Sequence, residues 1–213
     1  MNTMTARVYV VEDDDAVRDS LQLVLESVGH SVATYANANA FLDAYDADMA
    51  GCLVLDIRMP GMNGMELQRK LNERNSILPI IFVTGHGDVP MAVEAMQQGA
   101  VDFVQKPYRE QELLEKIARA FALDKENRES LSQRQAIASR LQSLTPRELD
   151  VLRLMVEGKA NKVIAIDLDI SQRTVEIHRA RVMEKLEAHS LAHLVRMVMA
   201  VDASLLQPRP SAD

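Results

Sequence analysis

The most restrictive feature of this sequence is a fivefold alternation between short apolar runs and amphipathic stretches across residues 7–123. The apolar runs have the length of strands, and the stretches between them carry apolar residues at helical spacing. Repeated strand–helix units form a parallel sheet covered by helices on both faces. We therefore predict a doubly wound α/β domain with a five-stranded parallel sheet. The expected strands are residues 7–11, 30–35, 51–55, 79–83 and 101–104, and the expected helices are 16–28, 38–45, 65–75, 89–98 and 110–123.

Polar residues directly follow several of these predicted strands. In doubly wound sheets, functional groups gather just past the carboxyl ends of the strands. Taken alone, an Asp after a buried strand has a simpler explanation, since Asp often begins a turn. Here one sheet edge would collect several such residues, which are Glu12, Asp13, Asp14, Asp15, Asp56, Thr84 and Lys106.

Clustered carboxylates raise each other's pKa unless a cation joins them. Oxygen ligands without His or Cys suit a hard ion such as Mg²⁺, so Asp13 and Asp56 are candidate ligands, with Glu12 acting directly or through water. A carboxylate can also act as a nucleophile and form an acyl phosphate. In that chemistry, Lys106 would neutralise phosphoryl oxygens and the Thr84 hydroxyl would donate a hydrogen bond.

The charge distribution divides the chain into two parts. The whole chain carries −7, which argues against a simple nucleic-acid binder. Residues 1–128 hold 12 Lys and Arg against 20 Asp and Glu, a net of −8, whereas residues 129–213 hold 12 against 11, a net of +1. We predict a first domain over 1–123, a helical linker over 124–143, a helical domain over 144–202 and a disordered tail over 203–213.

The linker has two possible forms on sequence alone. It is polar and lacks Gly and Pro, so it either continues the fifth helix or, as the alternative, is a flexible coil. Leu131, Ile137 and Leu141 within it form either a narrow apolar seam for a partner helix or chance apolar positions on a solvated helix.

The second domain shows clear helix boundaries. Thr145-Pro146-Arg147-Glu148 has the form of a capping box, and its helix ends before Gly158. A short helix over 161–168 and a tight turn follow, and Ser171 then caps a longer helix that reaches Leu186. A last helix is expected over 188–201. A short helix, a turn and a longer helix with exposed Arg residues form a helix-turn-helix arrangement.

Residues 7–122 resemble the flavodoxin-like receiver domain of two-component response regulators. The segments "VVEDDD", "LVLDIRMPGMNG", "IIFVTGHGD" and "GAVDFVQKPY" match its motifs in order, and "VTGHGDVPMAVEAMQQGAVDF" points to the FixJ-type branch. The resemblance implies a phosphoacceptor at Asp56 and a cis peptide before Pro107. It also implies a Mg²⁺ site of Glu12, Asp13, Asp56 and the Arg58 carbonyl, and switch residues Thr84, Phe103 and Lys106. Two positions depart from the common pattern: Glu12 stands where Asp is more frequent, and Tyr108 where Phe is.

Residues 144–200 resemble the LuxR/NarL-type helix-turn-helix output domain, through "LTPRELDVLRLMVEGKANKVIAIDLDISQRTVEIHRARVMEKL". Helical spacing places Thr174, His178 and Arg181 on one face, and Val175, Val182 and Leu186 toward the core. Glu176 has two interpretations, because Glu can accept a hydrogen bond from cytosine or pair with a nearby Arg. The candidate DNA-binding residues are Lys162, Ser171, Arg173, Thr174, Glu176, His178, Arg179 and Arg181.

Together, the two resemblances imply a phosphorylation-dependent transcriptional regulator rather than a dedicated enzyme. The expected partners are a sensor histidine kinase, operator DNA, a second copy of the chain after phosphorylation and, as a further candidate, RNA polymerase. No membrane partner is expected, and a cytoplasmic location follows from the lack of a signal peptide or apolar span and from the single cysteine, Cys52. Two rival functions are a phosphohydrolase with an aspartyl-phosphate intermediate and a receiver whose helical domain docks proteins. Arg58 argues against the first, since such hydrolases usually place a second Asp there.

Overall fold

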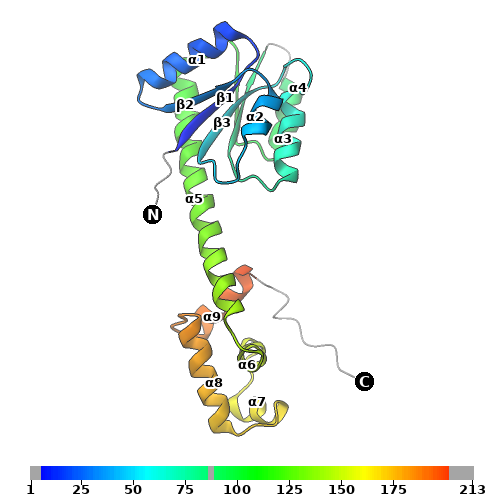
Figure 1. Ribbon diagram of the computed structural model, residues 1–213, viewed down its shortest axis with the longest axis vertical. Helices are drawn as coiled ribbons and strands as arrows, with labels where there is room; N and C mark the ends of the chain where they lie inside the picture. The colour runs from blue at the N-terminus through cyan, green and yellow to red at the C-terminus, as the bar shows by residue number, and fades with distance from the viewer. Residues whose placement is uncertain (1–5, 86–88, 202–213) are drawn as a thin grey trace. The chain divides into compact units, whose positions relative to one another are not determined.

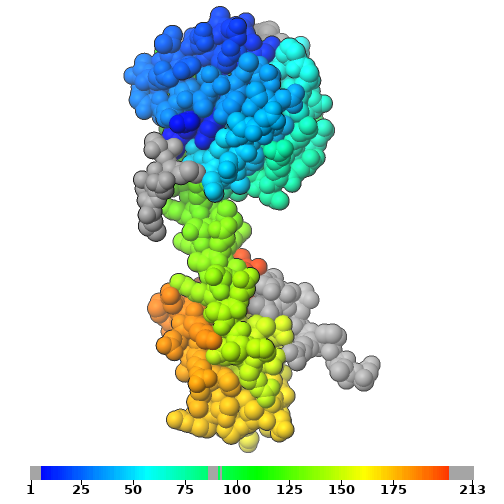
Figure 2. All heavy atoms as spheres, viewed as in Figure 1, coloured from blue at the N-terminus to red at the C-terminus, as the bar shows by residue number. Residues whose placement is uncertain are grey.

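The computed structural model describes residues 6–85 and 89–201. The chain divides into two compact units, Met1–Arg128 and Glu129–Asp213 (Figure 1). In the space-filling view each unit is a closely packed body (Figure 2). The tail predicted to be disordered, 203–213, lies outside the described residues. Among the described helices, none is long and apolar enough to cross a membrane.

The first unit contains a five-stranded parallel sheet, as the alternating pattern predicted. Its order is β2-β1-β3-β4-β5, and neighbouring strands pair in parallel. The central strand is buried along its whole length, which explains its unbroken apolar run. The strands are β1 (Arg7–Val11), β2 (Ser31–Tyr35), β3 (Gly51–Asp56), β4 (Ile80–Thr84) and β5 (Asp102–Gln105).

Helices cover both faces of this sheet (Figure 1). On one face, Phe41, Leu67 and Ala95 share a core with side chains of the strands. On the other face, a second core contains Leu25 and Ile117. The helices of the first face are α2 (Ala38–Ala44), α3 (Gly64–Glu73) and α4 (Val89–Gln97), and those of the second are α1 (Asp15–Ser27) and α5 (Glu110–Gln142).

Helix α5 continues through the predicted linker, as the first of the two alternatives stated. It continues past residue 123 and covers the expected linker as far as Gln142, so the flexible-coil alternative is wrong. Asp124 is buried and accepts a hydrogen bond from the Gly51 backbone at 2.9 Å. Arg128 Nε donates to Asp124 at 3.0 Å, and its terminal nitrogens donate to the Asp48 and Met49 carbonyls, which holds this part of α5 against the loop before β3. The domain boundaries themselves stay a prediction.

The apolar residues of the linker do not form one continuous seam. Ile137 and Leu141 pack against the core of the second unit, whereas Leu131 is 42% exposed. The seam for a partner helix would need all three side chains on a free surface. Two of them are used inside the second unit, so the structure does not support that alternative.

The second unit is helical, as predicted. Its helices are α6 (Pro146–Val156), α7 (Asn161–Asp167), α8 (Gln172–Lys185) and α9 (Leu191–Val201). Thr145 and Glu148 form the predicted capping box at the start of α6. Glu148 is buried and receives a hydrogen bond from Lys185 Nζ at 2.6 Å. That hydrogen bond is the main reason that the Glu148 pKa is lowered to about 2.

Candidate functional site

The three predicted acidic ligands lie together at the carboxyl edge of the sheet. Asp56 is the last residue of β3 and is 8% exposed, and Glu12, directly after the neighbouring β1, is 2% exposed. Asp13 is exposed beside them. One carboxylate oxygen from each residue lies within 4.8 Å of the others. Pairing of β1 with β3, with Val11 opposite Leu55, brings the three residues together.

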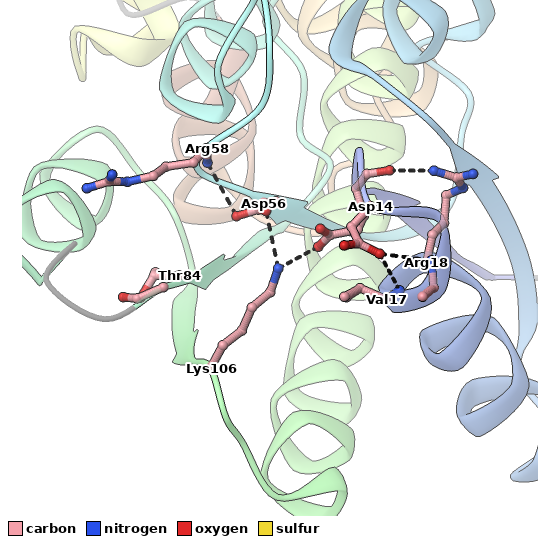
Figure 3. Close-up of polar contacts among 10 residues, drawn as sticks. Asp14, Val17, Arg18, Asp56, Arg58, Thr84 and Lys106 are labelled. Atoms are coloured by element: carbon pink, nitrogen blue, oxygen red, sulfur yellow. Dashed lines mark hydrogen bonds and ion pairs between the residues drawn. The ribbon is translucent and has the colours of Figure 1, made fainter.

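Lys106 reaches this acidic cluster from the end of β5 (Figure 3). Its Nζ lies 2.8 Å from Glu12 Oε2 and 3.2 Å from Asp56 Oδ2. Burial alone would lower the Lys106 pKa, but the hydrogen bond to Glu12 and the charge of Asp56 outweigh burial and raise it. Lys106 therefore stays protonated between the two carboxylates.

Burial is the main influence on Glu12. It raises the Glu12 pKa above the ordinary value, the hydrogen bond from Lys106 acts in the opposite direction, and the charge of Asp56 raises the pKa further. A second cation at this edge would relieve the repulsion between the carboxylates. The donor set consists of carboxylate oxygens, which suits a hard divalent ion such as Mg²⁺.

The acidic loop after β1 is held by two residues that sequence reasoning did not assign a role. Asp14 caps α1, and its Oδ1 accepts from the Ala16 and Val17 backbones at 2.9 and 3.1 Å. Arg18 (Figure 3) donates from Nη1 to the Glu12 carbonyl at 2.9 Å, and its other terminal nitrogen pairs with Asp15. The sequence contained one indication of this contact, since Arg18 lies one turn into the helix that follows the acidic run.

The loop after β3 is shaped around Asp56. The Arg58 backbone donates to Asp56 Oδ1 at 3.3 Å, while its side chain points away from Asp56 (Figure 3). Asn63 and Glu66 form a capping box that begins α3. A Cβ at Gly64 would lie 2.3 Å from the Asp56 carbonyl oxygen, so only glycine allows α3 to begin this close to the site.

The predicted switch residues occupy the neighbouring strand ends. Thr84 is buried at the end of β4 (Figure 3), and its hydroxyl donates to the Gly85 carbonyl at 3.3 Å. Phe103 in β5 is partly buried and packs against the core beneath α2, α3 and α4. The peptide between Lys106 and Pro107 is cis, as the resemblance implied. Thr84 and Phe103 thus lie on the adjacent strands β4 and β5, in which Phe82 stands opposite Phe103.

Most candidate DNA-binding residues in the second unit lie on α8 or at its start. Ser171 caps α8 and accepts from the Thr174 backbone at 3.1 Å. The predicted core positions of the helix, Val175, Val182 and Leu186, are all buried. Lys162 lies on α7. Of the candidates, Lys162, Ser171, Arg173, Glu176 and Arg181 are exposed, and Thr174, His178 and Arg179 are half-buried.

Of the two interpretations of Glu176, the structure supports pairing with a nearby Arg. Arg173 Nη1 lies 3.5 Å from Glu176 Oε2 in an exposed pair. An exposed pair of this kind contributes little to stability, so DNA could displace it at low cost. The His178 Nδ1 atom is buried and has no hydrogen-bond partner among the described residues.

Comparison with known proteins agrees with both halves of this description. Residues 8–118 match the response regulator receiver domain, and residues 142–198 match the bacterial regulatory proteins of the luxR family. The chain therefore belongs to the response regulators of two-component systems, and its second unit is a LuxR-type DNA-binding domain. It is a transcriptional regulator, like the relatives it resembles over nearly its full length.

Two of these relatives illustrate the similarity. The transcriptional regulatory protein FixJ of Bradyrhizobium diazoefficiens is 46% identical over 197 residues, which cover 92% of this chain and 96% of that protein. The response regulator protein TodT of Pseudomonas putida is 40% identical over 205 residues, covering 96% and 90%.

Two solved structures are also similar. The response regulator StyR has a TM-score of 0.81 at 44% identity, and the match covers 91% of this chain and 98% of that one. Full-length FixJ from B. japonicum has a TM-score of 0.58 at 45% identity, with 93% of this chain and 98% of that one covered.

As a response regulator with a DNA-binding domain, the chain has a kinase and DNA as partners.

Proposed function

We propose that Asp56 accepts a phosphoryl group from a sensor histidine kinase, and that this modification promotes dimerisation and operator binding. The observation that carries the proposal is the position of Asp56 at the end of β3, beside Glu12 and Asp13 and 3.2 Å from Lys106 Nζ. A carboxylate oxygen of Asp56 would attack phosphorus, forming a P–O bond as the P–N bond to the kinase histidine breaks. The leaving imidazole takes up a proton.

Glu12, Asp13, Asp56 and the Arg58 carbonyl would hold Mg²⁺ at this edge. When bound, the ion supplies positive charge that neutralises the phosphoryl oxygens during transfer. Lys106 already pairs with Glu12 and Asp56, so its ammonium can turn from a carboxylate to a phosphoryl oxygen without a large movement. Arg18 keeps the Glu12 backbone in place through its bond to the carbonyl.

Transmission from the site would involve Thr84 and Phe103. The Thr84 hydroxyl would leave the Gly85 carbonyl and donate to the phosphoryl group, and Phe103 would turn inward into the space this opens. The face made by α4, β5 and the first part of α5 would then be remodelled and would dimerise. Two output domains would thereby occupy adjacent half-sites on DNA, with RNA polymerase as a further candidate partner.

A regulator fits these residues better than a dedicated phosphohydrolase. Two residues after Asp56 stands Arg58, which cannot act as the carboxylic acid/base of such an enzyme, and slow self-dephosphorylation is compatible with the regulatory role. Binding to chromosomal DNA would place the protein in the cytoplasm.

The proposal is tested by selecting binding sites from a random duplex DNA pool, with and without beryllofluoride and Mg²⁺. We expect enrichment of a two-fold symmetric site only with the acyl-phosphate mimic, and no enrichment with Asp56→Asn. Equal enrichment in both conditions would remove phosphorylation as the switch. No enrichment in either condition would favour a protein-docking role for the second unit.

A further inference from the structure

Helix α4 carries exposed apolar side chains within its described part. Among its described side chains Ala95 is fully buried and Met91 packs against the core, while Val93 and Met96 are 49% and 38% exposed. The neighbouring α3, by contrast, buries both Leu67 and Leu71. Within the described residues, α4 therefore has fewer fully buried side chains than α3, and a segment with fewer buried contacts is displaced more easily.

The C-terminal end of α4 is nevertheless attached to α3 by two side-chain amides. Gln68 Nε2 donates to the Ala95 carbonyl at 3.0 Å, and Asn72 Nδ2 donates to the Gln98 carbonyl at 2.9 Å. Residues four apart lie on the same face of a helix, so both amides of α3 point at α4. The Ala95 carbonyl lies in the last turn of α4 and the Gln98 carbonyl directly follows the helix, so both bonds join α3 to this end of α4.

Backbone contacts close the same end of α4. The Ala100 backbone donates to the Ala95 carbonyl at 3.0 Å, and the Gly99 backbone donates to the Met96 carbonyl at 3.1 Å. With Gly99 at φ 97°, these bonds form a Schellman motif. The Val101 backbone then donates to Ile80 at the start of β4. This end of α4 is therefore fixed to its surroundings on two sides.

Gln68 is an unusual residue to find at this position. It is 0% exposed, and its Oε1 has no hydrogen-bond partner among the described residues. A buried acceptor without a donor is unfavourable, and an apolar side chain of similar length would avoid that cost. What the amide provides and an apolar side chain cannot is the bond from Nε2 to the Ala95 carbonyl of α4.

We propose that Gln68 is a positioning residue that makes the C-terminal end of α4 a fixed pivot, with Asn72 as a second anchor. The inference rests on the proposed function and concerns how Asp56 controls the dimerising face. When Thr84 moves toward a phosphoryl group, α4 rotates about this pivot, and the displacement is largest toward its N-terminal end. The rotation changes how the exposed Val93 is presented to a second copy, whereas Met96, next to Ala95, moves little.

Without the pivot, α4 would occupy its alternative positions whether or not Asp56 is modified. Dimerisation would then lose part of its dependence on the phosphoryl group. The test is Gln68→Met in the full chain, with the dimer association constant measured by sedimentation equilibrium with and without beryllofluoride and Mg²⁺. We expect the association constant with the mimic, divided by the constant without it, to fall at least fivefold. The main cause should be a rise in the constant without the mimic.

The same variant separates positioning from a structural role. Because Met removes a buried atom that lacks a partner, we expect the Tm of Gln68→Met to equal or exceed that of the natural protein. Hydrogen exchange should be faster at the Gly99 and Ala100 amides. Gln22→Met on α1 is the matched control, since Gln22 donates to Glu26 at 2.8 Å on another helix.

The outcomes distinguish the pivot from the proposed function. An unchanged ratio in Gln68→Met, or an equal fall in the Gln22→Met control, would overturn the pivot. A loss of the ratio that comes with a lower Tm would also overturn it, because general destabilisation would then explain the result. If the natural protein itself gave no response to the mimic, the proposed function would fail, and the pivot with it.

Discussion

Lys106 Nζ lies between two carboxylates, 2.8 Å from Glu12 and 3.2 Å from Asp56, at the edge of the sheet where three strands end. The Lys106 ammonium therefore competes with a divalent cation for the negative charge of these two carboxylates. The same contact holds Lys106 close to Asp56, where a phosphoryl group would be attached. One residue thus influences both metal affinity and the response to phosphorylation.

Lys106→Ala is expected to tighten Mg²⁺ binding about three- to tenfold, since it removes a competing cation from partly buried carboxylates. Isothermal titration calorimetry of the full chain measures the change. Dimerisation in response to beryllofluoride should fall in the same variant, because no ammonium then meets the phosphoryl oxygens. Lys116→Ala is the control, since Lys116 pairs with Asp102 instead. Weaker Mg²⁺ binding in Lys106→Ala would contradict this view of the site.

Gly64→Ala is expected to destabilise the first unit by about 2–3 kcal/mol, because the new Cβ would meet the Asp56 carbonyl oxygen at 2.3 Å. Urea unfolding followed by circular dichroism gives the change. Gly29→Ala serves as comparison, since its Cβ meets nothing within 4 Å and only its φ of 88° is unfavourable. Equal losses in the two variants would show that α3 can move away from Asp56 at little cost.

Glu148 and Lys185 give the second unit a defined pH dependence. The Glu148 pKa is lowered to about 2 in the folded protein from an ordinary value of 4.5. Its contribution to stability is therefore complete above about pH 4.5 and is lost as the pH falls through 2. Glu148→Gln should cost about 1.5–3 kcal/mol near pH 7, the usual range for a hydrogen bond to a charged group.

The measurement for Glu148 is the free energy of unfolding of the second unit, from hydrogen exchange of α6 and α8 amides at several pH values. The natural protein and Glu148→Gln should differ most above pH 4.5 and converge toward pH 2. A constant difference across that range would mean that the charge on Glu148 is not the source of the stabilisation. Glu184→Gln, at an exposed position of α8, is the control.

Replacing His178 and Arg181 together by Ala should weaken DNA binding at least tenfold while α8 keeps its buried side. The fully buried Val175, Val182 and Leu186 are kept in this variant, and His178 is only half-buried. Fluorescence anisotropy with operator duplex at several salt concentrations gives the affinity and the slope of log affinity against log salt concentration. The magnitude of that slope should fall by about 1 for each phosphate contact that is lost. Arg196→Ala on α9 is the control. Full affinity in the double variant would mean that DNA contacts another face.

The sequence by itself determined the architecture of both units. The fivefold alternation of strands and helices indicated a parallel sheet, and the run from Gly51 to Asp56 is apolar up to its last residue because β3 is buried on both faces. The motifs that follow the strands placed Asp56 at the site before any geometry was known. In the second unit, Thr145 and Glu148 marked the start of α6, because a capping box is a local contact between residues three apart.

Only the tertiary structure decided which hydrogen bonds distant groups form with one another. Lys106 and Glu12 are 94 residues apart, and Asp124 and Gly51 are 73 apart, so no local pattern encodes their hydrogen bonds. The same holds for Gln68 and Ala95, which meet because α3 and α4 cover the same face of the sheet. Periodicity reports which side of one element is buried, whereas these contacts depend on strand order, which only packing of the whole domain determines.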